Sequence, residues 1–369
     1  MPCRSAEAAR APAPPPDPAP LLARLVADAT LEAAYAWLCA QRRDWPAAAD
    51  IWDFRRHWPA EKARLTAELL AGTFRFQPLH RATRADGETV EVWAARDALV
   101  LKALALVVGP QLPVAPRCVH VKGHGGLKGA VRQVAARLKG QAFVLRTDVQ
   151  DYYASIDHGQ LQERLAGVIP EKPIRRLLWQ HLRRTVEWGG LYRDIQRGVA
   201  RGSPLSPLLG AFFLGGLDAA LARLPVFAVR FMDDILVLAP TRWRLRRAVQ
   251  VVNRTLGALG LEKHPAKTCI GRVAKGFEFL GYRFGPGGLV GLARATRERF
   301  VARAARLYER ERAAPSPGAS PLGRYVRRFT GWACGGLAGA LSDGRGGWGR
   351  LTTGALLADP SNQGCARRE

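Results

Sequence analysis

The sequence has few acidic residues, scattered cysteines and no long apolar run. Its six cysteines show no paired spacing, which fits neither a zinc site nor a disulfide framework and indicates a reducing cytoplasm. No apolar stretch approaches the roughly 20 residues that a membrane-spanning helix needs. The opening is rich in Pro and Ala and lacks the apolar core of a signal peptide. We therefore expect a cytoplasmic protein without a membrane partner.

The shortage of acidic side chains leaves a large positive charge. Lys and Arg number 56 against 31 Asp and Glu, which gives a formal net charge of +25. Such an excess favours a polyanionic partner, nucleic acid before membrane. Ala, Arg, Gly and Pro are abundant together, so part of the excess reflects general composition. At 369 residues and 48% hydrophobic content, the chain can hold one large domain or two modest ones.

The most informative stretch is 226–240, where two apolar, β-prone runs flank Asp233 and Asp234. The pattern predicts a strand, a tight turn and a second strand. A hairpin with a polar turn would explain an isolated Asp-Asp pair. Here the run 235–238 is continuously hydrophobic, which is typical of a strand buried on both faces. Like charges held beside such a core favour divalent cations, and nucleotidyl transfer is the chemistry that most often needs a metal pair.

A third carboxylate is available at Asp148. Residues 141–148 form a short hydrophobic strand that ends in this acid. A carboxylate at the end of a buried strand is a common way to aim a metal ligand from a rigid element. Asp151 and Asp157 are weaker candidates, because each is more typical of a turn or a helix cap.

The remaining pattern predicts helices, two hairpins and two glycine-containing loops. Helices are expected from Leu31, over 59–72, 97–108, 208–221, 242–259, 296–312 and 322–332. A hairpin turn is expected at 85–88, and an alternating strand over 277–282 that pairs with 289–292. The basic loop 122–126 is either a plain connection or a backbone that passes close to phosphates. In the loop 198–207, Gly202 allows another backbone or a base to approach.

Arginines recur on one face of the expected helix 296–312. They are Arg299, Arg303, Arg306 and Arg310. A solvated surface and a groove for a phosphate backbone both explain such a stripe.

The order of these segments, over roughly residues 60–333, resembles a bacterial reverse transcriptase of the retron and group II intron-encoded kind. TDVQDYYASIDH is similar to the first palm motif, ARGSPLSPLL to the second and RFMDDILVLA to the third. LEKHPAKTCIG is similar to the fourth motif and FEFLGY to the primer grip, while RDALVLKAL and VKGHGG resemble upstream fingers segments. One such match is weak, but five in the right order are specific.

The resemblance implies an α+β right-hand polymerase with fingers, palm and thumb, in which helices flank an antiparallel palm sheet. It implies no separate nuclease domain and no evident maturase domain. Composition and periodicity predict a disordered Pro- and Ala-rich tail at 1–28, a helical region at 29–80 and a Gly-rich tail at 336–369. The resemblance implies fingers and palm at 81–290 and thumb helices at 291–335.

The resemblance also implies a role for each matched residue. Two Mg²⁺ ions, with Mn²⁺ as a substitute, would bind Asp148, Asp233, Asp234 and the backbone carbonyl of Val149. Tyr153 would be the steric gate that excludes a 2′-hydroxyl, and Lys267 would protonate or neutralise the leaving pyrophosphate. The nucleotide pocket would contain Arg201, Gly202, Ser203 and Pro204. Nucleic acid would contact Phe279, Leu280, Gly281 and Tyr282 of the primer grip, and Arg299, Arg303 and Arg306.

Two departures from the family pattern affect specific contacts. Arg201 stands where the family usually has Gln, which bears on template contact and fidelity. The basic residue commonly found after the fingers turn is missing from the segment 88–91. Arg81, Arg84 and Arg96 remain as candidate contacts for the triphosphate.

The implied function is RNA-directed DNA synthesis. Its partners would be an RNA template, a DNA or RNA primer and dNTPs, with a dedicated structured non-coding RNA in the retron case. Two alternatives stay open. One is template-independent or protein-primed DNA synthesis in phage defence. The other is a catalytically idle RNA-binding or splicing scaffold, although the three acids and Tyr153 are all present.

Overall fold

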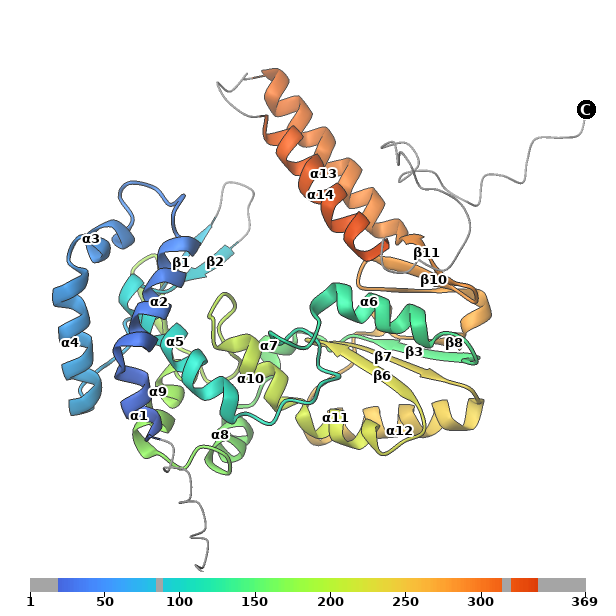
Figure 1. Ribbon diagram of the computed structural model, residues 1–369, viewed down its shortest axis with the longest axis horizontal. Coiled ribbons are helices and arrows are strands. Elements are labelled where there is room, and N and C mark those ends of the chain that lie inside the picture. The colour runs from blue at the N-terminus through green and yellow to red at the C-terminus, as the bar shows by residue number, and fades with distance from the viewer. Residues whose placement is uncertain (1–18, 84–88, 314–319, 338–369) are drawn as a thin grey trace, which may run out of the picture.

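The chain is organised around an antiparallel four-stranded sheet, which we call the central sheet (Figure 1). The computed structural model describes residues 19–83, 89–313 and 320–337. The strand order is β6-β7-β3-β8, and all three pairings are antiparallel. The strands span Phe227–Phe231 (β6), Asp234–Ala239 (β7), Phe143–Thr147 (β3) and Cys269–Arg272 (β8).

The central sheet separates two hydrophobic clusters. On β7, Ile235 and Val237 join one cluster, and Leu236 and Leu238 join the other. Helix α12 (Arg242–Ala258) packs on one face of the sheet, and α6 (Gly126–Arg137) lies over the other (Figure 1). Burial on both faces, which the continuous run 235–238 predicted, is confirmed.

The N-terminal part is helical and packs around a buried central helix. Its elements are α1 (Leu21–Val26), α2 (Asp28–Gln41), α3 (Asp50–Arg56), α4 (Trp58–Ala71), α5 (Ala95–Val108) and the short η1 (Gly109–Gln111). The expectation of disorder over 1–28 is wrong at its end, because α1 buries Leu21 and Leu25 against this core. Residues 1–18 lie outside the described residues.

A second sheet of order β2-β1-β4-β5 stands beside these helices. Its strands are β1 (Leu79–Thr83), β2 (Thr89–Val92), β4 (Thr185–Trp188) and β5 (Leu191–Asp194). The hairpin of β1 and β2 is present as expected, and its turn at 85–88 lies outside the described residues. Strands β1 and β4 form a short parallel pairing, which joins two distant segments of the chain.

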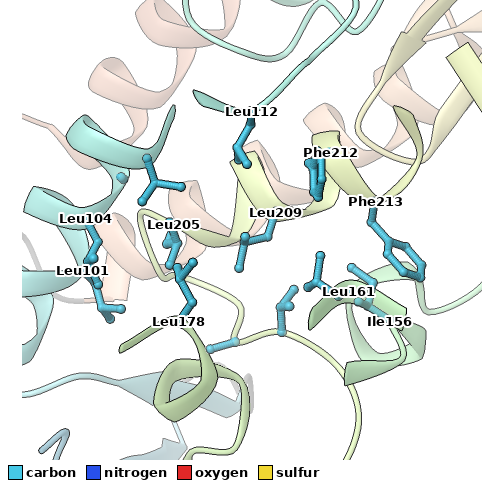
Figure 2. Packing of buried hydrophobic residues seen from close by; sticks show 14 of the residues in the cluster. Leu101, Leu104, Leu112, Ile156, Leu161, Leu178, Leu205, Leu209, Phe212 and Phe213 are labelled. Carbon is cyan, nitrogen blue, oxygen red and sulfur yellow. The ribbon is translucent and has the colours of Figure 1, made fainter. Parts of the chain in front are cut away.

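Five further helices connect this sheet to the central sheet. They are α7 (Tyr152–Ser155), α8 (His158–Ala166), α9 (Lys172–Leu182), α10 (Ser206–Phe213) and α11 (Gly215–Ala222). The single helix expected over 208–221 is therefore two helices, because the chain leaves helical geometry at Leu214, before a pair of glycines. Figure 2 shows Leu205, Leu209 and Phe212 of this region in the buried cluster, together with Leu101 and Leu104 of α5.

The C-terminal part is a small sheet followed by two long helices. Strands β9 (Phe277–Phe279), β10 (Tyr282–Gly285) and β11 (Gly288–Leu292) form the sheet, after the short helices η2 (Pro265–Lys267) and η3 (Val273–Lys275). The strand expected over 277–282 is wrong: Leu280 and Gly281 have φ of 48° and 84° and make the tight turn between β9 and β10. A two-residue hairpin turn with positive φ at both positions matches the twist of its strands.

Helices α13 (Arg294–Ala313) and α14 (Pro321–Leu337) pack side by side and project away from the sheets (Figure 1). They occupy the place of the expected thumb. The expected Gly-rich tail at 336–369 overlaps the end of α14, and residues 338–369 lie outside the described part. Within the described residues, no helix is long and apolar enough to cross a membrane.

The expected fold class is confirmed. The chain is α+β, and its central sheet is antiparallel and flanked by helices.

Candidate active site

Three carboxylates lie where two neighbouring strands of the central sheet end. Asp148 follows β3, Asp233 lies in the two-residue turn between β6 and β7, and Asp234 begins β7. Strands β3 and β7 are direct antiparallel neighbours, with Thr147 opposite Ile235. The register therefore brings all three acids to the same edge of the sheet.

Lys267 neutralises the most buried of these acids. Its Nζ donates to both carboxylate oxygens of Asp148 at 3.2 Å. Asp148 is 7% exposed, whereas the lysine side chain is about half exposed. The backbone of Asp148 is also held, because its carbonyl accepts from the His264 N–H at 2.8 Å. Lys267 thus lies beside the acids, as its predicted role requires.

The other two acids carry raised pKa values. Burial raises the pKa of Asp234 to about 6, with further contributions from repulsion by Asp148 and Asp233. Burial also raises the pKa of Asp233, and repulsion by Asp148 adds to this effect. A carboxylate whose ionised form is disfavoured by its neighbours gains stability from a cation beside it.

The donor set fits a hard divalent cation, since carboxylate and carbonyl oxygens are the ligands that Mg²⁺ prefers. Val149 lies opposite Lys263 in an isolated antiparallel bridge. The two hydrogen bonds of this bridge join Gln150 to Glu262 and His264 to Asp148, so the Val149 carbonyl is not used by it. Among the described residues, no three His, Cys, Asp or Glu side chains are gathered closely enough to form a ready ligand cluster. The ammonium of Lys267 supplies positive charge at this place.

A cleft of about 620 Å³ opens over Asp148 and Asp233, and we call it the Asp148 cleft. Tyr153 lines it, 5.5 Å between ring centroids from Tyr152. Burial, followed by repulsion from Asp233, raises the pKa of Tyr153 to about 12. Tyr153 is therefore a neutral ring next to the carboxylates, where the steric-gate prediction puts it.

The loop 201–204 contributes further residues to the lining of these clefts. Arg201, Gly202 and Ser203 line the Asp148 cleft, and Pro204 faces a neighbouring cleft on the fingers side. Gly198 fixes this loop against α7: its φ is +87°, and a Cβ would lie 2.8 Å from the Tyr153 carbonyl oxygen. A glycine is therefore required where the loop passes the steric-gate candidate.

Two further clefts adjoin the Asp148 cleft and share lining residues with it. The fingers-side cleft, about 880 Å³, shares Arg201 and Gly202 with it. The thumb-side cleft, about 520 Å³, shares Asp148 and Lys267 and also contains Asp234. We call these three adjoining clefts the active-site groove, and together they give room for an extended polymer beside the carboxylates.

The predicted primer grip is partly corrected. Leu280 and Gly281 line the thumb-side cleft. Phe279 and Tyr282 are fully buried in the second hydrophobic cluster, so their side chains do not face the groove. Tyr282 instead accepts from Lys128 Nζ at 2.5 Å and donates to the Trp332 carbonyl, which ties α6 to α14.

The predicted arginine stripe divides in a similar way. Arg299 lines the thumb-side cleft. Arg303 and Arg306 are exposed and line none of the three clefts, and Arg303 lies over the Tyr325 ring at 5.3 Å.

The candidate triphosphate contacts in the fingers are engaged elsewhere. Arg81 pairs with Glu91 at 2.7 Å, and Arg96 pairs with Glu68 at 2.5 Å. Arg84 lies outside the described residues. Asp157 caps α8 by accepting from the Gln160 N–H, which is one of the two roles expected for it.

A buried ion pair that the sequence reasoning missed supports the acidic turn. Arg230 on β6 pairs with Asp218 on α11, and both are almost fully buried. The Arg230 Nη1 also donates to the Met232 carbonyl at 2.8 Å, directly before Asp233. A charged residue inside an otherwise apolar strand was the available signal, but its partner lies on another element.

His120 was also missed. Its Nδ1 accepts from the Met232 N–H at 3.0 Å, and its Nε2 donates to the Pro207 carbonyl at 3.0 Å. Burial lowers the pKa of His120, which favours the neutral ring that these two bonds require. Met232 has a φ of +56°, so the turn is strained and is held from both sides.

The curated relatives include the Retrovirus-related Pol polyprotein from type-1 retrotransposable element R2 of Nasonia vitripennis, 28% identical over 158 residues, which are 38% of this chain and 15% of that protein. Protein YkfC of Escherichia coli (strain K12) is 23% identical over 269 residues, 59% of this chain and 70% of that protein. The chain thus spans only a small part of the R2 polyprotein.

A solved structure described as a partial Cas6-RT-Cas1–Cas2 complex contains a similar chain. The two are 20% identical with a TM-score of 0.41, over 65% of this chain and 41% of that chain. The model of the family "Reverse transcriptase (RNA-dependent DNA polymerase)" matches residues 99–284, half of the chain, including the three acids, Tyr153 and Lys267. The chain belongs to the reverse transcriptase family.

Proposed function

We propose that this protein is an RNA-directed DNA polymerase of the retroelement type, related to retron and group II intron-encoded enzymes. One observation carries the proposal: Asp148, Asp233, Asp234, Lys267 and Tyr153 all line two adjoining clefts of the active-site groove. The segments 81–290 and 291–335 would act as fingers with palm and as thumb. The substrates would be an RNA template, a primer with a 3′-hydroxyl, and dNTPs.

The carboxylates would hold two Mg²⁺ ions, or Mn²⁺, together with the Val149 carbonyl. Bound metal would activate the primer 3′-hydroxyl and neutralise the triphosphate and the departing pyrophosphate. The raised pKa values of Asp233 and Asp234 support this assignment, because a cation relieves the repulsion that causes part of the shift.

The chain's own side chains would position the substrates. Lys267 would exchange its contact with Asp148 for the pyrophosphate, to which it can donate a proton or a charge-assisted hydrogen bond. Tyr153 would stand against the sugar and exclude a 2′-hydroxyl. Arg230 and His120 would keep the turn fixed, so that little reorganisation is needed during transfer.

The test is a copying reaction on a defined RNA template with an annealed DNA primer, Mg²⁺ and all four dNTPs. The expected product is DNA complementary to the template, and its sequence is read directly. A reaction without template should give no product. Products of the same sequence with and without template would support untemplated synthesis instead. No product in either case, with RNA still bound, would support the scaffold function.

A further inference from the structure

A second groove lies on the outer side of the central sheet, and we call it the α12 groove. Its volume is about 890 Å³, and it shares no lining residue with the three clefts of the active site. It runs between the first half of α12, the start of β3 and the edge strand β8. Phe143 at the start of β3 lines it, whereas Asp148 follows the end of the same strand. At about 3.3 Å per residue, the two are roughly 16 Å apart along the chain.

The α12 groove is strongly basic. Five of its lining residues are cations and none is acidic: Arg242, Arg246, Arg247, Arg272 and Lys275. All five are exposed. In the described part of the chain, no carboxylate lies within ion-pair distance of any of them. Their charge is therefore available to a partner.

The helix dipole gains nothing from cations at this end of α12. Helix α12 begins at Arg242, carries no acidic residue in its first turn and places Arg244, Arg246 and Arg247 close behind. The N-terminal end of a helix is the positive end of its dipole, so these charges repel both the dipole and one another. Thr241 already caps the helix by accepting from the Arg244 N–H.

Two large apolar side chains are exposed among these cations. Trp243 is 70% exposed and Ile270 is 54% exposed, and both line the groove. The Cζ of Arg246 lies 5.1 Å from the centroid of the Trp243 ring. An open indole among unpaired arginines is the combination that binds unpaired bases by stacking and phosphates by charge.

We propose that the α12 groove is a second nucleic-acid site, which holds a single-stranded segment outside the active site. Its phosphates would lie on the five cations, and one unpaired base would stack on Trp243. Paired bases cannot reach an indole in this way, so the ligand is a loop, a bulge or a free strand. The site does not depend on the polymerase reaction, and it would retain RNA beside the enzyme while the active-site groove is occupied.

The test measures binding of a second strand to protein whose active-site groove is already filled. The full chain is saturated with a short RNA–DNA hybrid, and a fluorescent single strand of about 12 nucleotides is added. We expect one further strand to bind. The single strand is tested as RNA and as DNA, which shows whether the groove prefers one of the two nucleic acids. Tighter binding of RNA identifies an RNA site, and equal binding identifies a site for either strand.

Two variants separate stacking from charge. Trp243→Ala should weaken binding of the second strand roughly 5- to 150-fold, the range found for loss of one base-stacking contact. In the double variant Arg246→Ala/Arg247→Ala, binding should depend less on salt. The magnitude of the slope of log K against log salt should fall by about 1.4, because two phosphate contacts are lost. The matched control is Arg55→Ala/Arg56→Ala, which removes two exposed arginines on α3, near Trp52. It should change neither quantity.

Extension of the short hybrid is measured in parallel and should be equal in wild type and all variants. Absence of a second bound strand, or equal affinity in the groove variants and the control, would overturn the proposal. If the groove binds an acidic peptide and single-stranded nucleic acid does not displace that peptide, the groove is a protein-binding site, and this result would overturn the proposal too. If circular dichroism shows that Arg246→Ala/Arg247→Ala is unfolded, Arg246→Gln/Arg247→Gln replaces this double variant, and the same criteria apply. Failure of hybrid extension in wild type would instead count against the polymerase function.

Discussion

Asp97 on α5 is a buried acid outside the active site, and it allows a test of burial without any effect of metal. It is fully buried, its Oδ2 accepts from the Gln77 N–H at 2.8 Å, and burial raises its pKa to about 7. Its nearest charges are Arg96, Asp50 and Glu68. The unfolded pKa is about 3.9, so the native state binds the proton more tightly. This contribution to stability is complete below about pH 4 and is lost as pH rises through 7.

Asp97→Asn should therefore stabilise the protein at pH 8 and have a smaller effect at pH 5. The amide keeps an acceptor for Gln77 and carries no charge. We expect a gain of at least about 1 kcal/mol at pH 8, roughly 1–2 °C in Tm for a chain of this length. Thermal unfolding of wild type and variant at both pH values measures this. A gain that is the same at both pH values would contradict the raised pKa.

Tyr153→Ala should admit ribonucleotides. The ring lies beside the carboxylates, and discrimination at a steric site is a ratio of kcat/KM values. We expect the dNTP to rNTP ratio to fall by about tenfold to a hundredfold, mostly through faster use of rNTP. The matched control is Tyr152→Phe, whose ring is buried next to Tyr153 and whose hydroxyl donates to the Gly210 carbonyl. An unchanged ratio in the alanine variant would remove Tyr153 from sugar selection.

At the residue scale, the sequence could predict those site residues whose position depends only on their neighbours along the chain. Asp148, Asp233 and Asp234 stand at strand ends that their own neighbours define, and the register of β3 and β7 brings them together. His120 and Arg230 could not be found in this way. Their partners are Met232 and Asp218, and these contacts depend on how distant elements pack against one another. The spacing of residue types along the sequence gives no information about such packing.

At the element scale, the β6–β7 hairpin should depend on the buried pair of Arg230 and Asp218. Asp218→Ala leaves a buried guanidinium without its carboxylate, which costs about 3–5 kcal/mol. Glu298→Ala, which breaks the exposed pair with Arg294, should cost less than about 1 kcal/mol. Urea unfolding of both variants measures the difference. Equal costs would show that the hairpin is held mainly by its apolar contacts.

Element types were predictable where the pattern is long and regular, and less so where a turn interrupts it. Helix α5 is apolar throughout, and α4 ends at Gly72 in the left-handed conformation, as its sequence indicates. The segment 277–282 alternates like a strand, yet Leu280 takes a positive φ so that β9 can turn back on β10. Pairing between the two strands outweighs the local preference of leucine.

At the scale of the whole molecule, the positive charge should make hybrid binding strongly dependent on salt. Arg303 and Arg306 line none of the three clefts in the free protein, but they lie on α13 beside Arg299, which does. If the hybrid extends along α13, Arg303→Ala/Arg306→Ala should make binding less dependent on salt. The magnitude of the slope of log K against log salt should fall by roughly 1.5–2. Fluorescence anisotropy over a salt series measures this, with Arg55→Ala/Arg56→Ala as the control. An unchanged slope would make these two arginines ordinary solvated surface.

The central claim is that the three carboxylates carry the reaction while the basic surfaces carry the nucleic acid. The most direct measurement is single-turnover extension of a primer on RNA by Asp148→Asn, Asp233→Asn and Asp234→Asn, with hybrid affinity measured in parallel. Asp157→Asn is the matched control, because this acid caps α8 and Asn caps equally well. We predict that each of the three variants loses about 10³-fold or more in rate with little change in affinity, while the control keeps both. Near wild-type extension by any of the three would contradict the account.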